Sequence, residues 1–409
     1  MSGRFGVLHN KSFRALWLGE WVAELGGAAA GLCNGLLLYQ LTGSTSALGM
    51  MWLVYFLPSL VIQLAAGPMI DRLPKKSIMA VSQFSRAVLF LVPAIWLMVS
   101  VYPVWMLYSV QFVLGCIQPF YVPAGMSLLP VIVKPSDLKA ANAYLDGTLR
   151  LMGFLAPAAG GMIIASSNLE WAYAGAGVLF FLSFLSLRNI EEKTTVSVKK
   201  KSWFMQIKDG YRFFFGSQHI IGLTVLSGIV QFGVGTAMVI NIPYVLEELK
   251  GTPFLYGLFA AGFPLGYTVG SALAGKYGPK NMYRASMLGG LLAGGLSFIG
   301  LALAESYYVA LACEIAAGIF FPFFNIYNTT LLQKLIPEEV RGSVFSMRLL
   351  VIRAAMPLGI IFAGQLGEVA GIRGLYLIVG LLITASVFLC VWFPGFKKMD
   401  SPILFHNQQ

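Results

Sequence analysis

Long apolar runs alternate with short polar gaps along the whole chain. A helix needs about 20 apolar residues to cross the ~30 Å hydrocarbon core of a bilayer. Barrel strands would be half as long and would alternate apolar and polar positions, so only helices fit runs of this length. The pattern predicts an all-α integral membrane protein with twelve transmembrane helices. The runs are residues 13–41, 46–70, 77–100, 103–133, 142–166, 170–189, 219–246, 254–275, 282–303, 306–333, 343–369 and 373–396.

Lysine and arginine are distributed unevenly between the two alternating sets of gaps. Most of the 28 basic residues fall in gaps that would face one side, whereas the opposite gaps carry only Lys250 and Arg373. Basic loops stay on the cytoplasmic side of a membrane. We therefore expect a multi-pass protein of the cell membrane with both termini in the cytoplasm. Four basic residues lie within spans: Arg86, Arg150, Arg348 and Arg353.

The longest polar gap divides the chain into halves of six spans each. Its basic and aromatic residues, such as Lys199 to Lys201 and Trp203, predict a solvated linker that ends in an amphipathic helix on the inner leaflet. The halves look related, because Pro135 to Ala140 resembles Pro337 to Gly342. We expect two pseudo-symmetric six-helix bundles with a cavity between them. The predicted parts are 1–188 (first bundle), 189–218 (linker), 219–396 (second bundle) and 397–409 (cytoplasmic tail).

Composition agrees with a membrane protein and argues against a nucleic-acid partner. The chain is 57% apolar and 11% charged, with a formal net charge of +11. Soluble domains carry about 25% charged residues. Because most of the basic residues lie in the gaps between spans, the positive charge indicates membrane orientation. The four cysteines lie inside apolar runs without C-x-x-C spacing, so neither disulfides nor a metal site are expected.

Motifs for nucleotide or enzyme chemistry are incomplete or absent from the sequence. Gly270 to Lys276 has the spacing of a P-loop, but Tyr277 stands where the magnesium-binding Ser or Thr belongs. These glycines suit close helix contact instead, since Gly262, Gly266 and Gly270 form a four-residue repeat. The sequence has no H-E-x-x-H pair and no G-x-S-x-G elbow. We expect neither an enzyme nor a cofactor.

Charged residues inside spans are candidates for function, because burial there is costly without a cavity or a partner. Glu20 and Glu24 are four residues apart and share one helix face. At ~1.5 Å per residue, Glu24 lies about 16 Å above Phe13, near mid-bilayer. We expect Glu24 to line the cavity, while Glu20 either lines it or reaches interfacial water.

Two further pairs of charges have alternative interpretations. Asp146 and Arg150 are also four residues apart, and form either an internal ion pair or a pair that a transported proton breaks. Glu314 has no charged neighbour in sequence and is a candidate proton carrier. It either stands alone or pairs with Arg353, in which case it stays ionised until a proton or substrate intervenes. Uncharged polar residues within spans either bind substrate in the cavity or bridge helices. Those assigned to the cavity are Asn34, Gln118, Gln231, Asn241 and Asn325.

The polar turn at the end of the second span carries the most specific motif. Its pattern G-x-x-x-D-R-x-x-K-K comprises Gly67, Asp71, Arg72, Lys75 and Lys76. It resembles the loop between helices 2 and 3 of the major facilitator superfamily of transporters. The alternative is a basic turn that only anchors two helices at the interface. The resemblance implies the major facilitator fold and a gating role, in which Asp71 accepts hydrogen bonds when the cavity faces outward.

Other stretches resemble one branch of that superfamily. Asn10 to Trp17 is similar to the macrolide-efflux-like branch of bacterial drug:proton antiporters. Pro157, Gly160 and Gly161 resemble the antiporter signature G-P-x-x-G-G, with Ala156 at its first position. The contexts of Asp146 and Glu314 are similar to those of proton-coupling carboxylates in such antiporters. The resemblance thus implies proton-coupling roles for Asp146 and Glu314, and the position of Glu24 near mid-bilayer makes it a third candidate for proton coupling.

These observations together predict a secondary active transporter that exports amphipathic, drug-like or macrolide-like molecules by alternating access, coupled to protons. The alternative is an exporter or flippase of a lysophospholipid, a siderophore or a peptide natural product, in which Arg150 and Arg353 bind an anionic group. The expected partners are a small-molecule substrate, protons and membrane lipids, without nucleic acid. The protein is expected to act as a monomer.

Replacing Asp71 by Asn tests the gating role of the motif. Loss of the carboxylate should weaken the outward-facing contacts and shift the resting population toward an inward-open state. Spin-label distances across the cytoplasmic face would measure the shift. Unchanged distances would reduce Asp71 to a residue that sets membrane orientation.

Overall fold

A computed structural model describes residues 6–99, 103–134, 137–166, 169–192, 211–277, 283–336 and 338–392. These residues are almost entirely helical and contain no strand. The chain divides into two compact units, of which unit 1 comprises Met1–Val198 with Gly251–Ala261, and unit 2 comprises Lys199–Lys250 with Gly262–Gln409. The predicted division at 188, 218 and 396 stays a prediction, because most of the linker and all of the tail lie outside the described residues.

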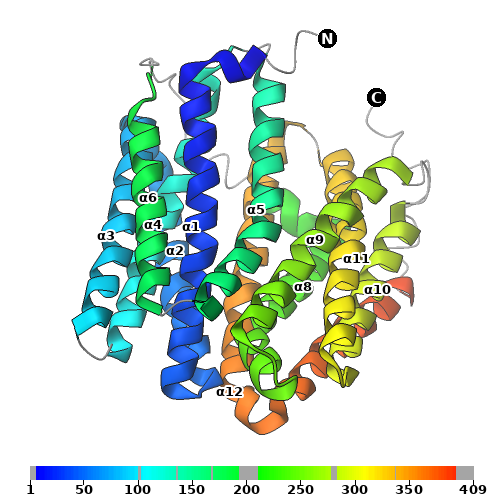
Figure 1. Cartoon of the computed structure of the whole chain (residues 1–409). Coiled ribbons are helices and arrows are strands. Elements are labelled where there is room, and N and C mark those ends of the chain that lie inside the picture. Colours follow the sequence, from blue (N-terminus) through cyan, green and yellow to red (C-terminus); the bar gives the residue numbers. More distant parts are fainter. Residues whose placement is uncertain are drawn as a thin grey trace. The chain divides into compact units, whose positions relative to one another are not determined.

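Unit 1 contains six long helices whose bounds follow the predicted apolar runs within a few residues (Figure 1). Polar gaps as short as two residues separate some of them, and glycine or an N-cap side chain ends or begins several. Gly43, for example, adopts φ 61° and donates its N–H to the Tyr39 carbonyl after the first helix. The helices are α1 (Lys11–Thr42), α2 (Thr45–Arg72), α3 (Lys75–Val99), α4 (Val104–Ile132), α5 (Leu138–Ser166) and α6 (Leu169–Arg188).

The helices assigned wholly or mostly to unit 2 also follow the predicted runs. They are α8 (Gln218–Pro243), which continues as a π-helical turn (Tyr244–Glu248), α9 (Pro253–Tyr277), α10 (Tyr283–Leu303), α11 (Tyr307–Leu335) and α12 (Glu338–Trp392). The first turns of α9 belong to unit 1. α12 contains two of the predicted spans. Its backbone leaves the helical conformation only at Gly371, at φ 70° and ψ 159°, and this break separates the two spans.

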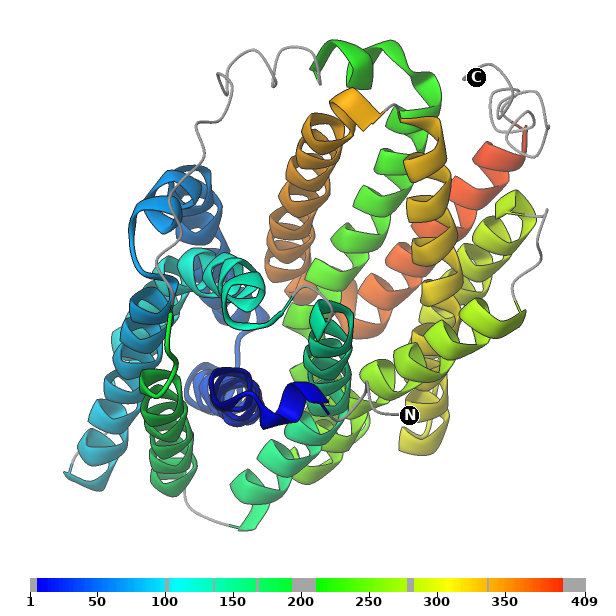
Figure 2. The same cartoon turned by 90° about the horizontal axis from the view of Figure 1, so that it is seen from above.

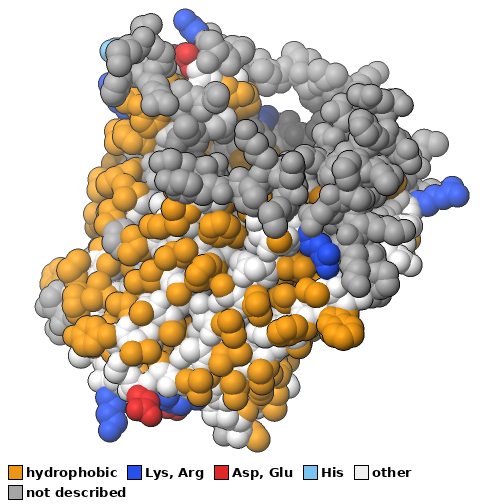
Figure 3. Space-filling model, turned by 90° about the vertical axis from the view of Figure 1, so that its right-hand side faces the viewer, with side chains coloured by type: hydrophobic (Ala, Val, Ile, Leu, Met, Phe, Trp, Pro, Cys, Tyr) orange, Lys and Arg blue, Asp and Glu red, His pale blue; other side chains and the backbone are white. Residues whose placement is uncertain are grey.

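Eleven stretches of the described chain are long and apolar enough to cross a membrane, including both parts of α12. The remaining predicted span is α5, a helix of 29 residues. On the face drawn in Figure 3, hydrophobic side chains cover much of the described surface, and acidic side chains are visible only near its edges. The predicted fold class, an all-α integral membrane protein, is confirmed.

α1 is the central helix of unit 1. It packs against α6 and α5, while α3 packs against α6 and α4, and α2 packs against α4. Figure 2 shows α1 end-on between α6 and α5. The Asn10 side chain begins α1 by accepting the Phe13 N–H at 3.1 Å, and it donates to the Ile132 carbonyl at the end of α4 at 2.6 Å. One N-cap residue thus orients α1 and joins it to α4.

Unit 2 depends on close backbone contact between helices. A Cβ at Gly235 of α8 would overlap the Met356 carbonyl oxygen of α12, and a Cβ at Gly359 would overlap the Phe232 carbonyl oxygen. Hydrocarbon offers no hydrophobic drive for helices to associate, so small residues that allow such close approach favour packing. The repeat in α9 is used in this way, since a Cβ at Gly266 would overlap the Ile315 carbonyl oxygen of α11.

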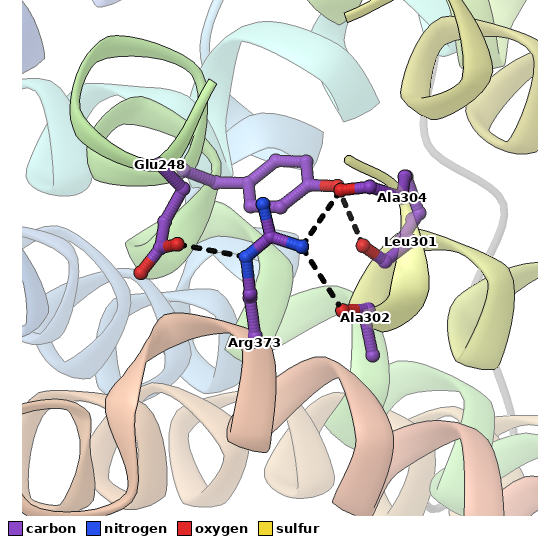
Figure 4. A network of polar contacts seen from close by, with 6 residues as sticks. Glu248, Leu301, Ala302, Ala304 and Arg373 are labelled. Carbon is purple, nitrogen blue, oxygen red and sulfur yellow. Dashed lines mark hydrogen bonds and ion pairs between the residues drawn. The ribbon is translucent and has the colours of Figure 1, made fainter. Parts of the chain in front are cut away.

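Arg373, one of two basic residues in the gaps predicted to face outward, has a structural role in unit 2 (Figure 4). Its Nε lies 2.7 Å from Glu248 Oε2, at the end of the π-helical turn. Its NH1 donates to the carbonyls of Ala304 at 2.7 Å and Ala302 at 3.4 Å. The guanidinium therefore joins the end of α8, the α10–α11 turn and the residues after the break in α12.

A matched pair of alanine substitutions tests the close contact between α8 and α12. Gly359→Ala should destabilise the protein by about 1–3 kcal/mol, because the added methyl group forces the two backbones apart. Gly289→Ala of α10, whose Cβ would meet nothing within 4 Å, should be neutral or should stabilise by up to about 1 kcal/mol through helix propensity. Denaturant unfolding in detergent micelles measures both. Equal effects would argue against the contact.

Candidate functional site

Unit 1 contains a cavity of about 590 Å³ that all six of its long helices line. This volume lies within the range of small-molecule sites, roughly 300–1,000 Å³. Its charged and polar lining residues are Glu20, Glu24, Arg86, Gln111, Gln118, Tyr121, Asn142 and Thr148. Its large apolar and aromatic lining residues are Trp52, Tyr55, Phe90, Leu114, Val122, Met126, Leu129, Leu145, Leu149 and Phe180.

Both glutamates of α1 point into this cavity, as their four-residue spacing allows. They are half-buried, and neither forms an ion pair with Arg86, the charged group of α3 that lines the same cavity. Gln118 of α4 completes the set of predicted cavity residues found here. Sequence reasoning thus selected three residues that the structure brings together, although their roles stay predictions.

Arg86 is a cavity residue to which the sequence analysis assigned no role. Its side chain is 7% exposed, and its NH2 donates to Gln118 Oε1 at 2.6 Å. The guanidinium carbon lies 4.7 Å from the centre of the Tyr121 ring and 5.8 Å from that of Phe180. A basic residue in the middle of an apolar span was the available signal, because such a charge is expensive without a function or a partner.

Buried polar side chains gather beside Arg86. They include Tyr121 and Gln83, which lies one turn away on α3. The Tyr121 hydroxyl interacts with Gln83 and with Glu20, whereas the Arg86 Nε has no hydrogen-bond partner. Buried polar groups are normally paired, so this Nε is a point at which water or a bound molecule can supply the missing bond.

Aromatic rings form much of the remaining wall. α2 contributes Trp52 and Tyr55, whose rings meet edge to face at 6.1 Å. α4 passes close to Tyr55 at Gly115, where a Cβ would overlap the Tyr55 carbonyl oxygen. Aromatic faces attract cations, and they also bind apolar rings. Such walls around two carboxylates suit an amphipathic ligand with a positive charge.

Asn34, by contrast, is not among the residues that line this cavity. It is buried between helices, where its Nδ2 donates to the Leu107 carbonyl at 3.3 Å and its Oδ1 accepts the Tyr173 hydroxyl at 2.7 Å. Three helices, α1, α4 and α6, are joined at this point. The position fits the bridging alternative for Asn34 better than substrate binding.

The predicted residues of unit 2 are not among the residues that line this cavity. Glu314 of α11 is 8% exposed, and its Cγ would lie 3.5 Å from a Cβ at Gly262 of α9. Arg353 of α12 is exposed, and Gln231 of α8 is half-buried. Asn325 donates to the Tyr267 hydroxyl at 3.3 Å, and Asn241 accepts from the Tyr376 hydroxyl. These two asparagines bridge helices within unit 2.

Part of the predicted gating motif can be placed through its backbone. The N–H groups of Lys75 and Lys76, at the start of α3, donate to the two carboxylate oxygens of Glu192 at 3.0 and 2.9 Å. The neighbouring Glu191 N–H donates to Ser12 Oγ at 3.0 Å. A carboxylate at a helix N-terminus satisfies free amides and complements the helix dipole. The segment after α6 therefore holds the starts of α1 and α3.

The structure does not describe the side-chain environment of several predicted site residues. They are Gly67, Asp71 and Arg72 of the gating motif, and Asp146 and Arg150 of α5.

The antiporter-like motif of α5 lies at close helix contacts. A Cβ at Gly160 would lie 3.2 Å from the Ala29 Cα of α1, and one at Gly161 would lie 2.9 Å from the Gly257 Cα at the start of α9. The Pro157 carbonyl oxygen also faces α9, because a Cβ added at Gly257 would lie 2.7 Å from it. All these residues belong to unit 1. The motif therefore permits α5 to approach two helices at backbone distance.

Replacing Asn34 by Leu tests whether it bridges helices or binds substrate. Loss of two buried hydrogen bonds should destabilise the protein by about 1–3 kcal/mol, measured by unfolding in detergent. Tyr173→Phe removes one of the two bonds and should cost less. If Asn34 only bridges helices, relative transport rates of different substrates should not change in the variant that still folds. A changed substrate preference with unchanged stability would instead favour the cavity role.

Comparisons with known proteins agree with this architecture. The sequence profile of the transmembrane secretion effector family, a major facilitator family, matches residues 2–408. Macrolide efflux protein A of Streptococcus pyogenes is 24% identical over 397 residues, which cover 95% of this chain and 97% of that protein. Multidrug efflux pump Tap of Mycolicibacterium fortuitum is 27% identical over 381 residues, covering 89% and 91%.

A solved structure supports the same fold. The crystal structure of a bacterial homologue of the iron transporter ferroportin, in an inward-facing state, superposes with a TM-score of 0.73 at 18% identity. The superposition covers 97% of this chain and all of that one, 100%. With the profile match over nearly its full length, this chain belongs to the transmembrane secretion effector family of major facilitator transporters.

Proposed function

We propose that this protein is a proton-coupled exporter of amphipathic small molecules that works by alternating access in the cell membrane, with both termini in the cytoplasm. The observation that carries the proposal is the cavity of unit 1, in which Glu20 and Glu24 lie among aromatic and aliphatic walls. The family is one of transporters, and the relatives named as macrolide and multidrug efflux proteins support export of such molecules.

The chemistry of coupling follows from competition for the same carboxylates. An ionised Glu24 attracts a cationic ligand, whereas a protonated Glu24 does not, so proton and ligand occupy the site alternately. Desolvation inside the bundle strengthens this exclusion, because charges interact more strongly away from water. Ligand leaves when a proton arrives from outside, and the proton leaves on the cytoplasmic side. Glu314 of unit 2, buried in α11, is the second proposed proton carrier.

Reconstitution into liposomes with an acidic interior tests the proposal. A screen of lipophilic cations, macrolides and lysophospholipids should identify compounds whose uptake depends on the pH gradient. If the uptake of every compound is independent of the pH gradient, the antiport mechanism is rejected. Gradient-independent movement of lysophospholipid alone would favour the lipid-exporting alternative.

Charge-neutralising variants then assign the proton carriers. Glu24→Gln and Glu314→Gln should abolish gradient-driven uptake, because each removes a site that must alternate between proton and charge. Glu305→Gln is the matched control, since Glu305 is exposed in the α10–α11 turn. Wild-type rates in Glu314→Gln would remove that residue from the mechanism, and wild-type rates in Glu24→Gln would remove the cavity carboxylate.

A further inference from the structure

Arg86 is the only basic residue among the described residues that line the cavity of unit 1. It faces groups from several helices. α1 contributes the two acids, Glu20 and Glu24, and α4 and α2 contribute the phenols of Tyr121 and Tyr55. α6 contributes Phe180, and the described lining residues of α5 are Asn142, Leu145, Thr148 and Leu149, none of which is charged. The proposed function uses the acids of this set and leaves the guanidinium unexplained.

The guanidinium is held in place by neutral groups. Gln118 accepts a hydrogen bond from its NH2, and the Tyr121 and Phe180 rings lie against it. An arginine in a protein keeps its proton, so this positive charge is permanent. The charge of Arg86 acts on both glutamates, and the three charges together act on whatever occupies the cavity that they line.

The charges of the described residues that line the cavity do not balance without a bound ligand. Two ionised carboxylates and one guanidinium sum to one negative charge. One monovalent cation, or one proton on a glutamate, neutralises the cavity. A dication would leave one positive charge in excess inside the bundle, where an unbalanced charge is costly.

We propose that Arg86 determines which ligand charge the cavity accepts: it restricts binding to amphipathic monocations, and it limits the exchange to one proton for each of them. This inference rests on the proposed function, since it assumes that the cavity binds the transported molecule. Without Arg86 the cavity would hold two uncompensated carboxylates, so a dication, or two protons, would become the neutralising occupant.

Equilibrium binding to the purified protein tests the inference. Tetraphenylphosphonium serves as the monocation and dequalinium as the dication. Wild-type protein should bind tetraphenylphosphonium more tightly. Arg86→Gln should shift the ratio of the two affinities toward dequalinium by on the order of tenfold, as expected for one unit charge a few ångströms away. Protons released for each dequalinium bound should rise relative to wild type.

Two control variants separate charge from structure. Arg86→Lys keeps the charge and should keep the wild-type ratio, whereas Arg86→Gln combined with Glu24→Gln restores one net negative charge and should return the ratio toward the monocation. If Arg86→Gln does not fold, the wild-type protein still decides, because dequalinium binding as tight as tetraphenylphosphonium binding would overturn the inference. An unchanged ratio in a folded Arg86→Gln variant would also overturn it.

The outcomes also distinguish this inference from the proposed function. If wild-type protein binds neither cation and shows no gradient-driven uptake in liposomes, the proposed function fails, and the inference fails with it. If the pH gradient drives transport of the monocation by the wild-type protein, and the Arg86→Gln variant has the same charge preference as the wild type, only the inference fails.

Discussion

Hydrocarbon offers no hydrogen-bond partner, and this constraint governs both the helices and the polar side chains between them. Every long segment satisfies its backbone within itself, as the helical bounds show. Polar side chains that enter the bundles are mostly paired there. In unit 2, for example, Asn328 Nδ2 donates to Ser227 Oγ at 3.0 Å, and Arg348 donates to the same oxygen at 3.1 Å. The unpaired Arg86 Nε is therefore informative, because Arg86 lines the cavity of unit 1.

The helices were predictable because the requirement for about 20 apolar residues is a property of the bilayer. The predicted runs before and after Gly371 match the two parts of α12, although no polar gap of several residues separates them. Glu20, Glu24 and Gln118 could be selected because charge or polarity in a span is costly. Asn34 gave the same signal as Gln118, and only packing shows that it bridges three helices. Tyr121 gave no signal, since a tyrosine in an apolar run resembles a packing residue.

The two units use their polar residues differently. Unit 2 commits Asn241, Asn325 and Arg373 to bonds between its own elements. Unit 1 commits Asn34 in this way, yet it leaves two carboxylates and a guanidinium around an open volume. Sequence symmetry between the halves therefore does not extend to their described interiors.

The contact of Glu192 with α3 shows that anchoring of the turn after α2 depends on its backbone and not on its side chains. Both oxygens of this carboxylate bind main-chain N–H groups, which every residue except proline possesses. The anchoring of α3 is thus indifferent to which side chains stand at positions 75 and 76. Those side chains are free to diverge, or to be selected for lipid headgroups or other partners, without loss of the anchor. Glu192, by contrast, has no such freedom, although nothing in its own sequence neighbourhood marks it.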